Sequence, residues 1–338
     1  MKLLTRLLRM RRPADSVAEE AALSEIHMEL LKEEYNTGEL KLNIHRIPGT
    51  GIEVVVGENP TVMFTAHVDT VHRDIELQDI YVDDVGKCWA EFEGNPSVLG
   101  ADDAAGIYIL MRLIKANKPG LYCFFQCEEH GGIGSSEYAN SMCPASIKQC
   151  ISFDRKGYRD VITFQGGSRC ASDEYATALA KALNFNMDVE DVFGYHPCDD
   201  GVFTDSYNFM DIVDECTNIS VGYFHEHTPN EYLDMQFLTS LADAVVQIDF
   251  EELPIHRDCE EAEETEDWIQ RMWPEYSDYC DTPLGGDVIV SVDVDDLDDI
   301  YLGAEELLNK YICDSPDVPL DILNYLDRVE YLLRKYVK

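Results

Sequence analysis

The stretch best suited to chemistry is a pair of adjacent glutamates, Glu128 and Glu129, that follows a short apolar run. That run, residues 121–125, predicts a buried strand, and two glycines follow shortly after the glutamates. Neighbouring carboxylates in a partly buried site repel each other and lose hydration. A divalent cation would reverse that cost, because it favours the charged form of nearby carboxylates. An exposed turn at the strand end is the alternative interpretation of this segment.

A second candidate follows the apolar strand predicted at 61–66. His67 and Asp69 are two residues apart, so their side chains share a face of an extended segment. A metal-bound imidazole usually donates its other N–H to a carboxylate or a carbonyl. This spacing suggests His67 as a ligand and Asp69 as the residue that orients it, although His-x-Asp also occurs by chance. We interpret His72 as an ordinary polar loop residue.

Two aspartates, Asp102 and Asp103, stand at the predicted start of a helix that continues through Leu113. An aspartate at a helix start commonly caps the first turn. We expect Asp103 to be the cap and Asp102 to face outward as a ligand. Capping alone would explain both residues if this were the only motif in the chain.

The remaining candidates also follow predicted strands. Asp154 ends a strand at 151–154, and a strand at 218–223 leads into a segment that contains His225 and His227. In an α/β sheet, such strand ends and the helix starts that follow them converge on one edge, where ligands bind. The recurrence of acidic and histidine residues at these positions predicts one shared site.

The elements that must position these residues alternate along the chain, which favours an α/β fold. A hairpin is expected at 78–93, with its turn at 84–87. Helices are expected at 14–34, 173–184 and 234–249, and a further helix opens within 99–107 and continues through 113. Strands are expected at 52–56, 61–66, 121–125, 151–154, 161–164 and 218–223.

Composition excludes some classes of partner. The chain has 66 acidic and 26 basic side chains and a net charge of -40, which disfavours nucleic acid and anionic membranes as partners. The 11 cysteines contain no CxxC pair, which favours a reducing compartment. The basic segment 1–12 lacks the features of a signal peptide, and no apolar stretch approaches the ~20 residues that span a bilayer. We expect a cytoplasmic protein; disorder of segment 1–12 and a homo-oligomer both stay open.

Together these motifs resemble the co-catalytic di-zinc exopeptidases. That clan includes zinc aminopeptidases, peptidase T, and the glutamate carboxypeptidase and acylase enzymes. The resemblance covers about residues 10–250 and implies a three-layer α/β/α sandwich around a central mixed, mostly parallel sheet. It is carried by His67-Val68-Asp69, Gly100-Ala101-Asp102-Asp103, Glu128-Glu129, Asp154 and His227-Thr228-Pro229-Asn230-Glu231.

The resemblance also implies roles for these residues. Two Zn²⁺ ions per chain are expected, with Co²⁺ or Mn²⁺ as substitutes. Asp102 would bridge them, Glu128 would be the general base, and Asp69 would orient His67. His225 competes with His227 for its place. The implied ligand pairs that complete the two metal sites are His67 with Asp154, and Glu129 with His227.

Spacing separates the branches of the clan. Asp154 and His227 are 73 residues apart (227 − 154), too few for an inserted lid domain, and the gap from His67 to Asp102 is 35 (102 − 67). The chain thus resembles the lidless zinc aminopeptidases in architecture, while 99–103 and 227–229 are more like peptidase T.

We therefore expect an aminopeptidase that acts on a peptide or small amide. The alternatives are a di- or tripeptidase, an N-acyl amino acid amidohydrolase, or a catalytically inactive interaction protein. Asp205 and Glu226 are candidates to bind a substrate amine, and Arg169 a substrate carboxylate. A structural or solvent-facing role is the competing interpretation of each.

The last part of the chain differs in composition. We expect residues 1–250 to form the catalytic domain and 251–338 an acidic, mainly helical C-terminal extension. Acidic runs lie at 260–267 and 293–299, and helical periodicity follows at 300–312 and 319–336. The extension could cap the catalytic domain, join subunits or bind a partner, and the sequence does not choose among these.

Overall fold

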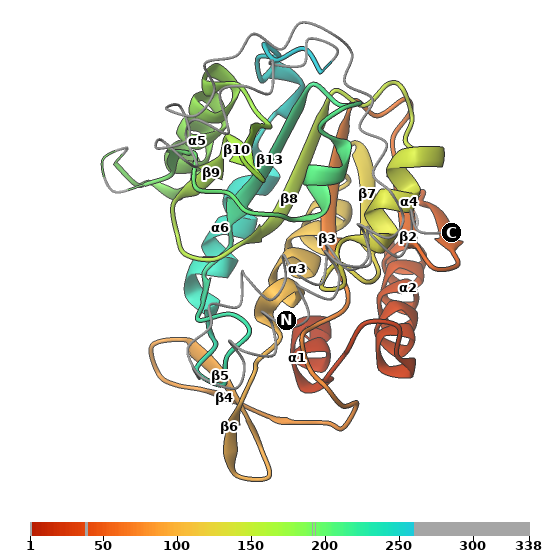
Figure 1. The fold of residues 1–338 in the computed structure, drawn as a ribbon, viewed down its shortest axis with the longest axis vertical. Coiled ribbons are helices and arrows are strands. Elements are labelled where there is room, and N and C mark those ends of the chain that lie inside the picture. Colours follow the sequence, from red (N-terminus) through yellow and green to blue (C-terminus); the bar gives the residue numbers. More distant parts are fainter. Residues whose placement is uncertain (1, 38–39, 191, 193, 260–338) are drawn as a thin grey trace, which may run out of the picture. The chain divides into compact units, whose positions relative to one another are not determined.

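A central sheet of eight strands organises the chain (Figure 1). The computed structural model describes residues 2–37, 40–190, 192 and 194–259. The four strands β7, β3, β8 and β13 run parallel to one another, while β1 and β2 are antiparallel at one side. The order across the sheet is β1 (Asn43–Ile47), β2 (Gly51–Val56), β7 (Gly120–Phe125), β3 (Val62–His67), β8 (Gln149–Arg155), β13 (Glu215–Ser220), β9 (Asp160–Ile162) and β12 (His196–Cys198).

Helices cover both faces of this sheet, so the predicted three-layer α/β/α fold is confirmed. On one face, α3 (Ala101–Lys115), α5 (Asp173–Met187) and α6 (Met235–Gln247) pack together. The other face carries α4 (Ile133–Ser141) and the 3-10 helix η1 (Asp205–Phe209). Strands β3 and β7 are buried at every position, as expected for strands covered on both faces.

Aromatic side chains from neighbouring strands form part of the core. The ring of Phe64 in β3 stacks on Tyr122 in β7 at 5.1 Å and on Phe153 in β8 at 6.2 Å. Phe250 meets the same ring edge-on at 4.9 Å. Such pairs contribute about 0.5–1.5 kcal/mol each beyond the burial of their area. These contacts stabilise the packing of β3, β7 and β8, the three strands that end at the candidate site.

The N-terminal segment is helical, so disorder of this segment is wrong for its described residues. Helix α1 (Lys2–Arg9) buries Leu3, Leu4, Leu7 and Leu8 and packs against α3 and α2 (Val17–Thr37). The four leucines recur at helical spacing and form one apolar stripe between basic residues. Beyond the helix, Arg12 is fully buried.

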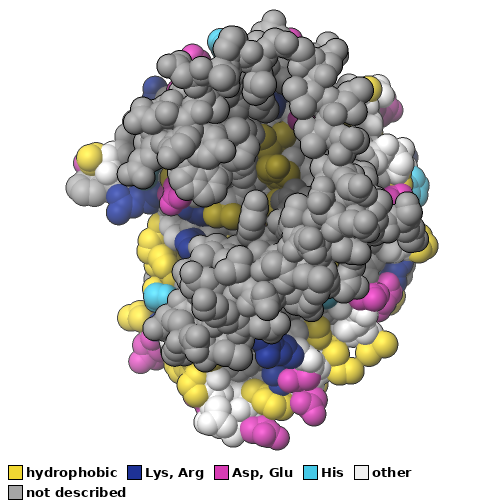
Figure 2. All heavy atoms as spheres, viewed as in Figure 1, with side chains coloured by type: hydrophobic (Ala, Val, Ile, Leu, Met, Phe, Trp, Pro, Cys, Tyr) yellow, Lys and Arg dark blue, Asp and Glu magenta, His cyan; other side chains and the backbone are white. Residues whose placement is uncertain are grey.

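A smaller sheet lies beside the main one, at the lower end of Figure 1. Its strands β4 (Asp79–Val82) and β5 (Lys87–Phe92) form the predicted hairpin. Around it hydrophobic and acidic side chains are exposed next to one another (Figure 2). The remaining strands of this sheet are β6 (Asn95–Ser97), β14 (Tyr223–Phe224) and β15 (Tyr232–Asp234). Because β14 and β15 enclose residues 225–231, this sheet positions the segment that contains His227.

Short elements complete the described chain, namely β10 (Phe164–Gln165), β11 (Ser168–Arg169) and η2 (Phe250–Glu252). After η2 the chain still contacts the sheet, since the Glu215 carboxylate accepts the N–H groups of His256 at 2.8 Å and Arg257 at 2.9 Å. The rest of the expected extension, 260–338, lies outside the described residues. Within the described part, none of the helices has the length and hydropathy that a bilayer crossing requires.

Candidate metal centre

The candidate residues meet at the carboxyl ends of three adjacent strands. His67 is the last residue of β3, Asp154 lies near the end of β8, and the two glutamates follow two residues after β7. Because these strands are parallel neighbours, their ends lie at the same edge of the sheet. The start of α3 brings Asp102 to this edge, and the loop after β14 brings His227.

His67 belongs to a group of three side chains, with Asp102 and Asp154, that could hold a metal ion. His67 Nε2 lies 2.9 Å from Asp102 Oδ1 and 3.6 Å from Asp154 Oδ1. The three donor atoms all lie within 4.8 Å of one another. Hydroxyl groups hold the third member, since Thr204 donates to Asp154 Oδ2 at 2.7 Å and Tyr223 donates to Asp154 Oδ1 at 3.2 Å.

A second group of three shares Asp102 with the first. His227 Nε2 lies 3.1 Å from Asp102 Oδ2 and 3.1 Å from Glu129 Oε1. Each oxygen of Asp102 therefore faces a different group. In the described part of the chain, His227 Nε2 and Glu129 Oε1 are buried without a hydrogen-bond partner. Buried polar atoms are normally paired, so two unpaired atoms that lie 3.1 Å apart fit a bound cation.

The competing histidine does not enter either group. His225 is exposed, and its ring lies 5.9 Å from that of Tyr232. Both histidines have a positive φ, 57° at His225 and 61° at His227, so the backbone turns sharply here. Of the two histidines in this turn, His227 is the one whose side chain lies next to Asp102.

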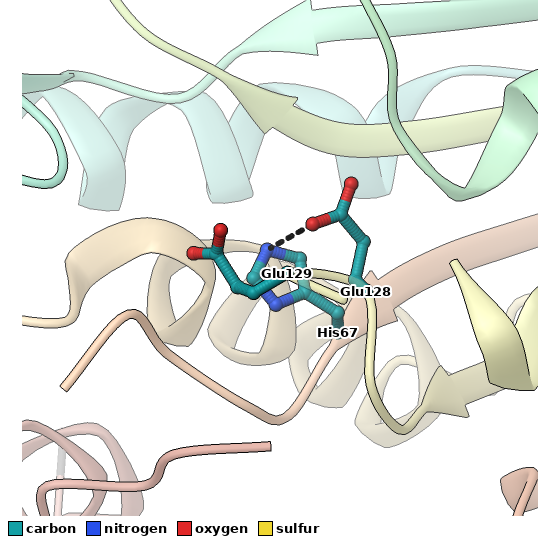
Figure 3. Close-up of side chains that lie close together, drawn as sticks. All are labelled: His67, Glu128 and Glu129. Atoms are coloured by element: carbon teal, nitrogen blue, oxygen red, sulfur yellow. Dashed lines mark ion pairs between the residues drawn. The ribbon is translucent and has the colours of Figure 1, made fainter. Parts of the chain in front are cut away.

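Glu128 stands beside the two groups but belongs to neither. Figure 3 shows His67 between the two glutamates, with the Glu128 carboxylate on one side and Glu129 on the other. The distance from Glu128 Oε2 to His67 Nε2 is 3.9 Å. These three residues could also hold an ion among themselves. If ions occupy the two groups that share Asp102, however, Glu128 is not a ligand and its carboxylate is free to exchange a proton.

Asp69 joins the loops that carry His67 and the glutamates. Its carboxylate accepts the backbone N–H groups of Glu128 and Glu129, both at 3.0 Å. His67 Nδ1 lies 3.2 Å from the Asp69 backbone carbonyl and 3.5 Å from its carboxylate. The hydrogen bond of the ring therefore ends on the carbonyl, whereas the carboxylate was expected. Donation from Nδ1 leaves Nε2 with a lone pair toward Asp102.

Two further carboxylates shape the segment around Asp102. Asp103 accepts the N–H of Gly106 at 2.9 Å, which confirms it as the helix cap, and the N–H of His67 at 3.2 Å. Regular helix begins only at Ala104, because Asp102 and Asp103 have non-helical backbone angles. Glu231 is buried and accepts four consecutive N–H groups, those of Leu99 (2.9 Å), Gly100 (3.1 Å), Ala101 (2.8 Å) and Asp102 (3.3 Å).

Burial and mutual repulsion shift the ionisation of these side chains. Burial raises the pKa of Glu129 to about 7 and that of Asp154 to about 6, and the charge of Asp102 adds to both shifts. Burial also raises the pKa of Glu128 well above its usual value. It would raise that of Asp102 too, but the adjacent rings of His227 and His67 hold this pKa below its usual range. A divalent cation would relieve the excess of negative charge.

Residues 51–243, more than half of the chain, match the model of the family described as "Peptidase family M28". The chain belongs to this family. A search of curated proteins found no match. As a member of the M28 family, the protein is classed with the metallopeptidases, a class of hydrolases, and the expected resemblance to the co-catalytic zinc exopeptidases is confirmed.

Solved structures with the same fold include enzymes with different activities. A tripeptidase from Staphylococcus aureus is similar with a TM-score of 0.53 and 15% identity, over 72% of this chain and 95% of that one. An aminopeptidase from the archaeon Desulfurococcus kamchatkensis has a TM-score of 0.53 and 12% identity, over 72% and 92%. A glutaminyl cyclase from Tannerella forsythia has a TM-score of 0.50 and 15% identity, over 74% and 97%. At these identities the likeness shows the fold alone.

The three candidates for binding a substrate terminus differ in surroundings. Glu226 pairs with Lys156 at 2.7 Å, and Arg169 pairs with Asp173 at 3.0 Å. Asp205 is buried within electrostatic reach of His67 and Asp154. Its Oδ1 has no hydrogen-bond partner in the described part of the chain, and burial raises its pKa to about 7.

Proposed function

We propose that this M28 protein is a two-zinc exopeptidase and, more specifically, an aminopeptidase. The observation that carries the proposal is the pair of three-residue groups that share Asp102. Mixed imidazole and carboxylate donors of this kind suit zinc, with cobalt or manganese able to replace it. A peptide is the substrate that the family supports.

The ligands divide between the two ions. His67 and Asp154 would hold the first and His227 and Glu129 the second, and Asp102 would be a ligand shared by both. Two zinc ions supply Lewis acidity, which activates water and polarises a scissile carbonyl at neutral pH. The hydrogen bonds on Asp154 from Thr204 and Tyr223 keep that carboxylate from rotating.

Glu128 moves the proton. Its carboxylate lies next to the ligands without being one of them, and its raised pKa suits a group that takes up a proton and later releases it. Asp69 holds Glu128 in place through the backbone N–H at 3.0 Å. In this assignment Glu128 Oε2 accepts the proton of the attacking water and delivers it to the leaving amine.

A free substrate amine would be recognised by a carboxylate close to the metals. Of the three candidate residues, Asp205 has a buried oxygen without a partner among the described residues, while Glu226 and Arg169 are engaged in ion pairs. This favours an aminopeptidase over an enzyme that holds a substrate carboxylate through Arg169. We further propose a cytoplasmic location, which accords with the nine described cysteines being free.

The test is metal content followed by a substrate screen. Protein purified without chelator is analysed for zinc, cobalt and manganese, and then assayed on aminoacyl-p-nitroanilides and their N-acetylated counterparts. Two ions per chain with release only from the free amines supports the proposal. Release only from N-acylated substrates would instead indicate an amidohydrolase, and cyclisation of N-terminal glutamine a glutaminyl cyclase. Absence of binding after metals are supplied would refute the assignment of the centre.

A further inference from the structure

Arg12 is a fully buried cation whose described side-chain hydrogen bonds all end on backbone carbonyls. Its Nε donates to the carbonyl of Val68 at 2.7 Å, and Nη2 donates to that of Gly100 at 3.3 Å. Nη1 donates to the carbonyls of Leu7 and Met10 within its own segment. Burying a guanidinium is costly unless its donors are satisfied, and here four carbonyls accept four of its five N–H groups.

The two distant carbonyls belong to the loops that carry the proposed ligands. Val68 directly follows His67, and Gly100 lies two residues before Asp102. The guanidinium thus connects the two loops by hydrogen bonds to the backbone of each. The backbone adds a second connection, since Thr70 N–H donates to the Arg12 carbonyl at 2.8 Å and Arg12 N–H donates to Thr70 Oγ1 at 3.1 Å.

The charge of Arg12 also suits this place. Burial lowers its pKa to about 10, while the carboxylates of Asp69, Glu231, Asp103 and Asp102 act to raise it. Arg12 therefore stays cationic at neutral pH beside a cluster of buried acids. The segment 1–12 is thus part of the structure behind the metal centre.

We propose that Arg12 is a positioning residue of the metal centre, which sets the separation between the loops that carry His67 and Asp102. The inference rests on the proposed function, because it assigns those two residues as metal ligands. A planar guanidinium can bond two carbonyls at fixed angles, whereas a lysine ammonium is a point charge that lacks the fork. Residues that orient metal ligands from behind typically change metal affinity about 10- to 100-fold when altered.

The experiment compares two variants with a matched control. Arg12→Lys retains the charge without the fork, and Arg12→Gln retains a donor without the charge. Arg9→Lys is the control, because Arg9 lies in the same segment with an exposed side chain. The dissociation constants for both zinc ions are measured by competition with a chromophoric chelator. Melting temperatures are recorded with and without zinc, and if one variant does not fold, the other provides the comparison.

The expected result is a zinc dissociation constant about 10-fold or more above wild type in both Arg12 variants, and an unchanged value in Arg9→Lys. A purely structural role would lower the melting temperature equally with and without zinc and leave the dissociation constants unchanged, and that result would overturn the inference. Failure of the wild-type protein itself to bind zinc would refute the proposed function instead, so the two failures are distinguishable.

Discussion

The carboxylate of Glu231 accepts the backbone N–H of Asp102, the proposed bridging ligand, at 3.3 Å. It also accepts the N–H groups of the three residues before Asp102, at 2.8 to 3.1 Å. One buried side chain therefore fixes the path of the loop that leads into α3. The carboxylate acts on the centre through the backbone, at a distance of 129 residues along the chain.

Replacement of this carboxylate should destabilise the protein. In Glu231→Gln an amide NH₂ faces backbone donors, so at least one buried N–H loses its acceptor at a cost of about 1–3 kcal/mol. Urea unfolding at pH 8, above the Glu231 pKa of about 7, should show a loss of that size. The control is Glu137→Gln, at an exposed position. Equal stability of Glu231→Gln and wild type would contradict the role assigned to Glu231.

Loss of the proton carrier should separate chemistry from metal binding. Glu128→Gln retains the shape of the side chain but cannot accept a proton, so kcat should fall by about 10²- to 10⁴-fold. Zinc content measured by mass spectrometry should remain that of wild type, because Glu128 lies outside the two groups that share Asp102. A variant that retains full hydrolytic activity with both metals bound would refute the mechanism.

Asp205 provides a test of the substrate class. If its buried carboxylate binds a free α-amine, Asp205→Asn loses a charge-assisted hydrogen bond of about 1.5–3 kcal/mol. KM for aminoacyl-p-nitroanilides should then rise about 10- to 100-fold, as that energy implies. The matched control is Glu226→Gln, which removes the carboxylate that pairs with Lys156. An equal KM in wild type and Asp205→Asn would exclude Asp205 as the amine site.

Removal of the metals should destabilise the fold, because it leaves the buried carboxylates without a counter-ion. Zinc at 100 times its dissociation constant stabilises a protein by about 2.7 kcal/mol per site. Calorimetry of chelator-treated protein should show a lower melting temperature that zinc restores and magnesium does not. Identical melting curves before and after chelation would show that the centre holds no stabilising ion.

His72 should contribute a pH dependence of stability. Its pKa is lowered to about 4 from 6.5, because burial disfavours the charged ring. The unfolded chain therefore takes up this proton at a higher pH than the folded protein, and stability falls as the pH decreases from 6.5 to 4. The full shift of the His72 pKa corresponds to a change of about 3 kcal/mol in the free energy of unfolding. Denaturant titrations of metal-free wild type and His72→Asn should differ in slope across this window, and parallel slopes would contradict the assignment.

Much of the centre could be predicted because its residues follow local rules. Strands 61–66 and 121–125 are almost wholly apolar, and they were expected within one residue of β3 and β7. The polar residues at their ends had to converge once the strands were parallel. The helix at α4 escaped prediction, because Ile133–Ser141 has few apolar residues and no clear periodicity.

The supporting residues could not be predicted, because they act through backbone contacts across long stretches of chain. Glu231 lay within a quoted motif, but nothing in its sequence position revealed its partners at 99–102. His72 was interpreted as an ordinary loop residue, yet it is buried and lies within hydrogen-bonding distance of Thr70 and the carbonyl of Val98. Glu19 likewise accepts the N–H of Cys127, 108 residues away.

The order in which the ligands occur has a consequence for biosynthesis. A nascent chain that has passed Asp154 already contains His67, Asp102 and Asp154, whereas the second group needs His227 and is fixed by Glu231. The ribosome must therefore translate 73 further residues (227 − 154) before the second group has its full set of donors. In the proposed assignment, a product that ends before His227 would therefore lack one donor of the second group, and its catalytic centre would be incomplete.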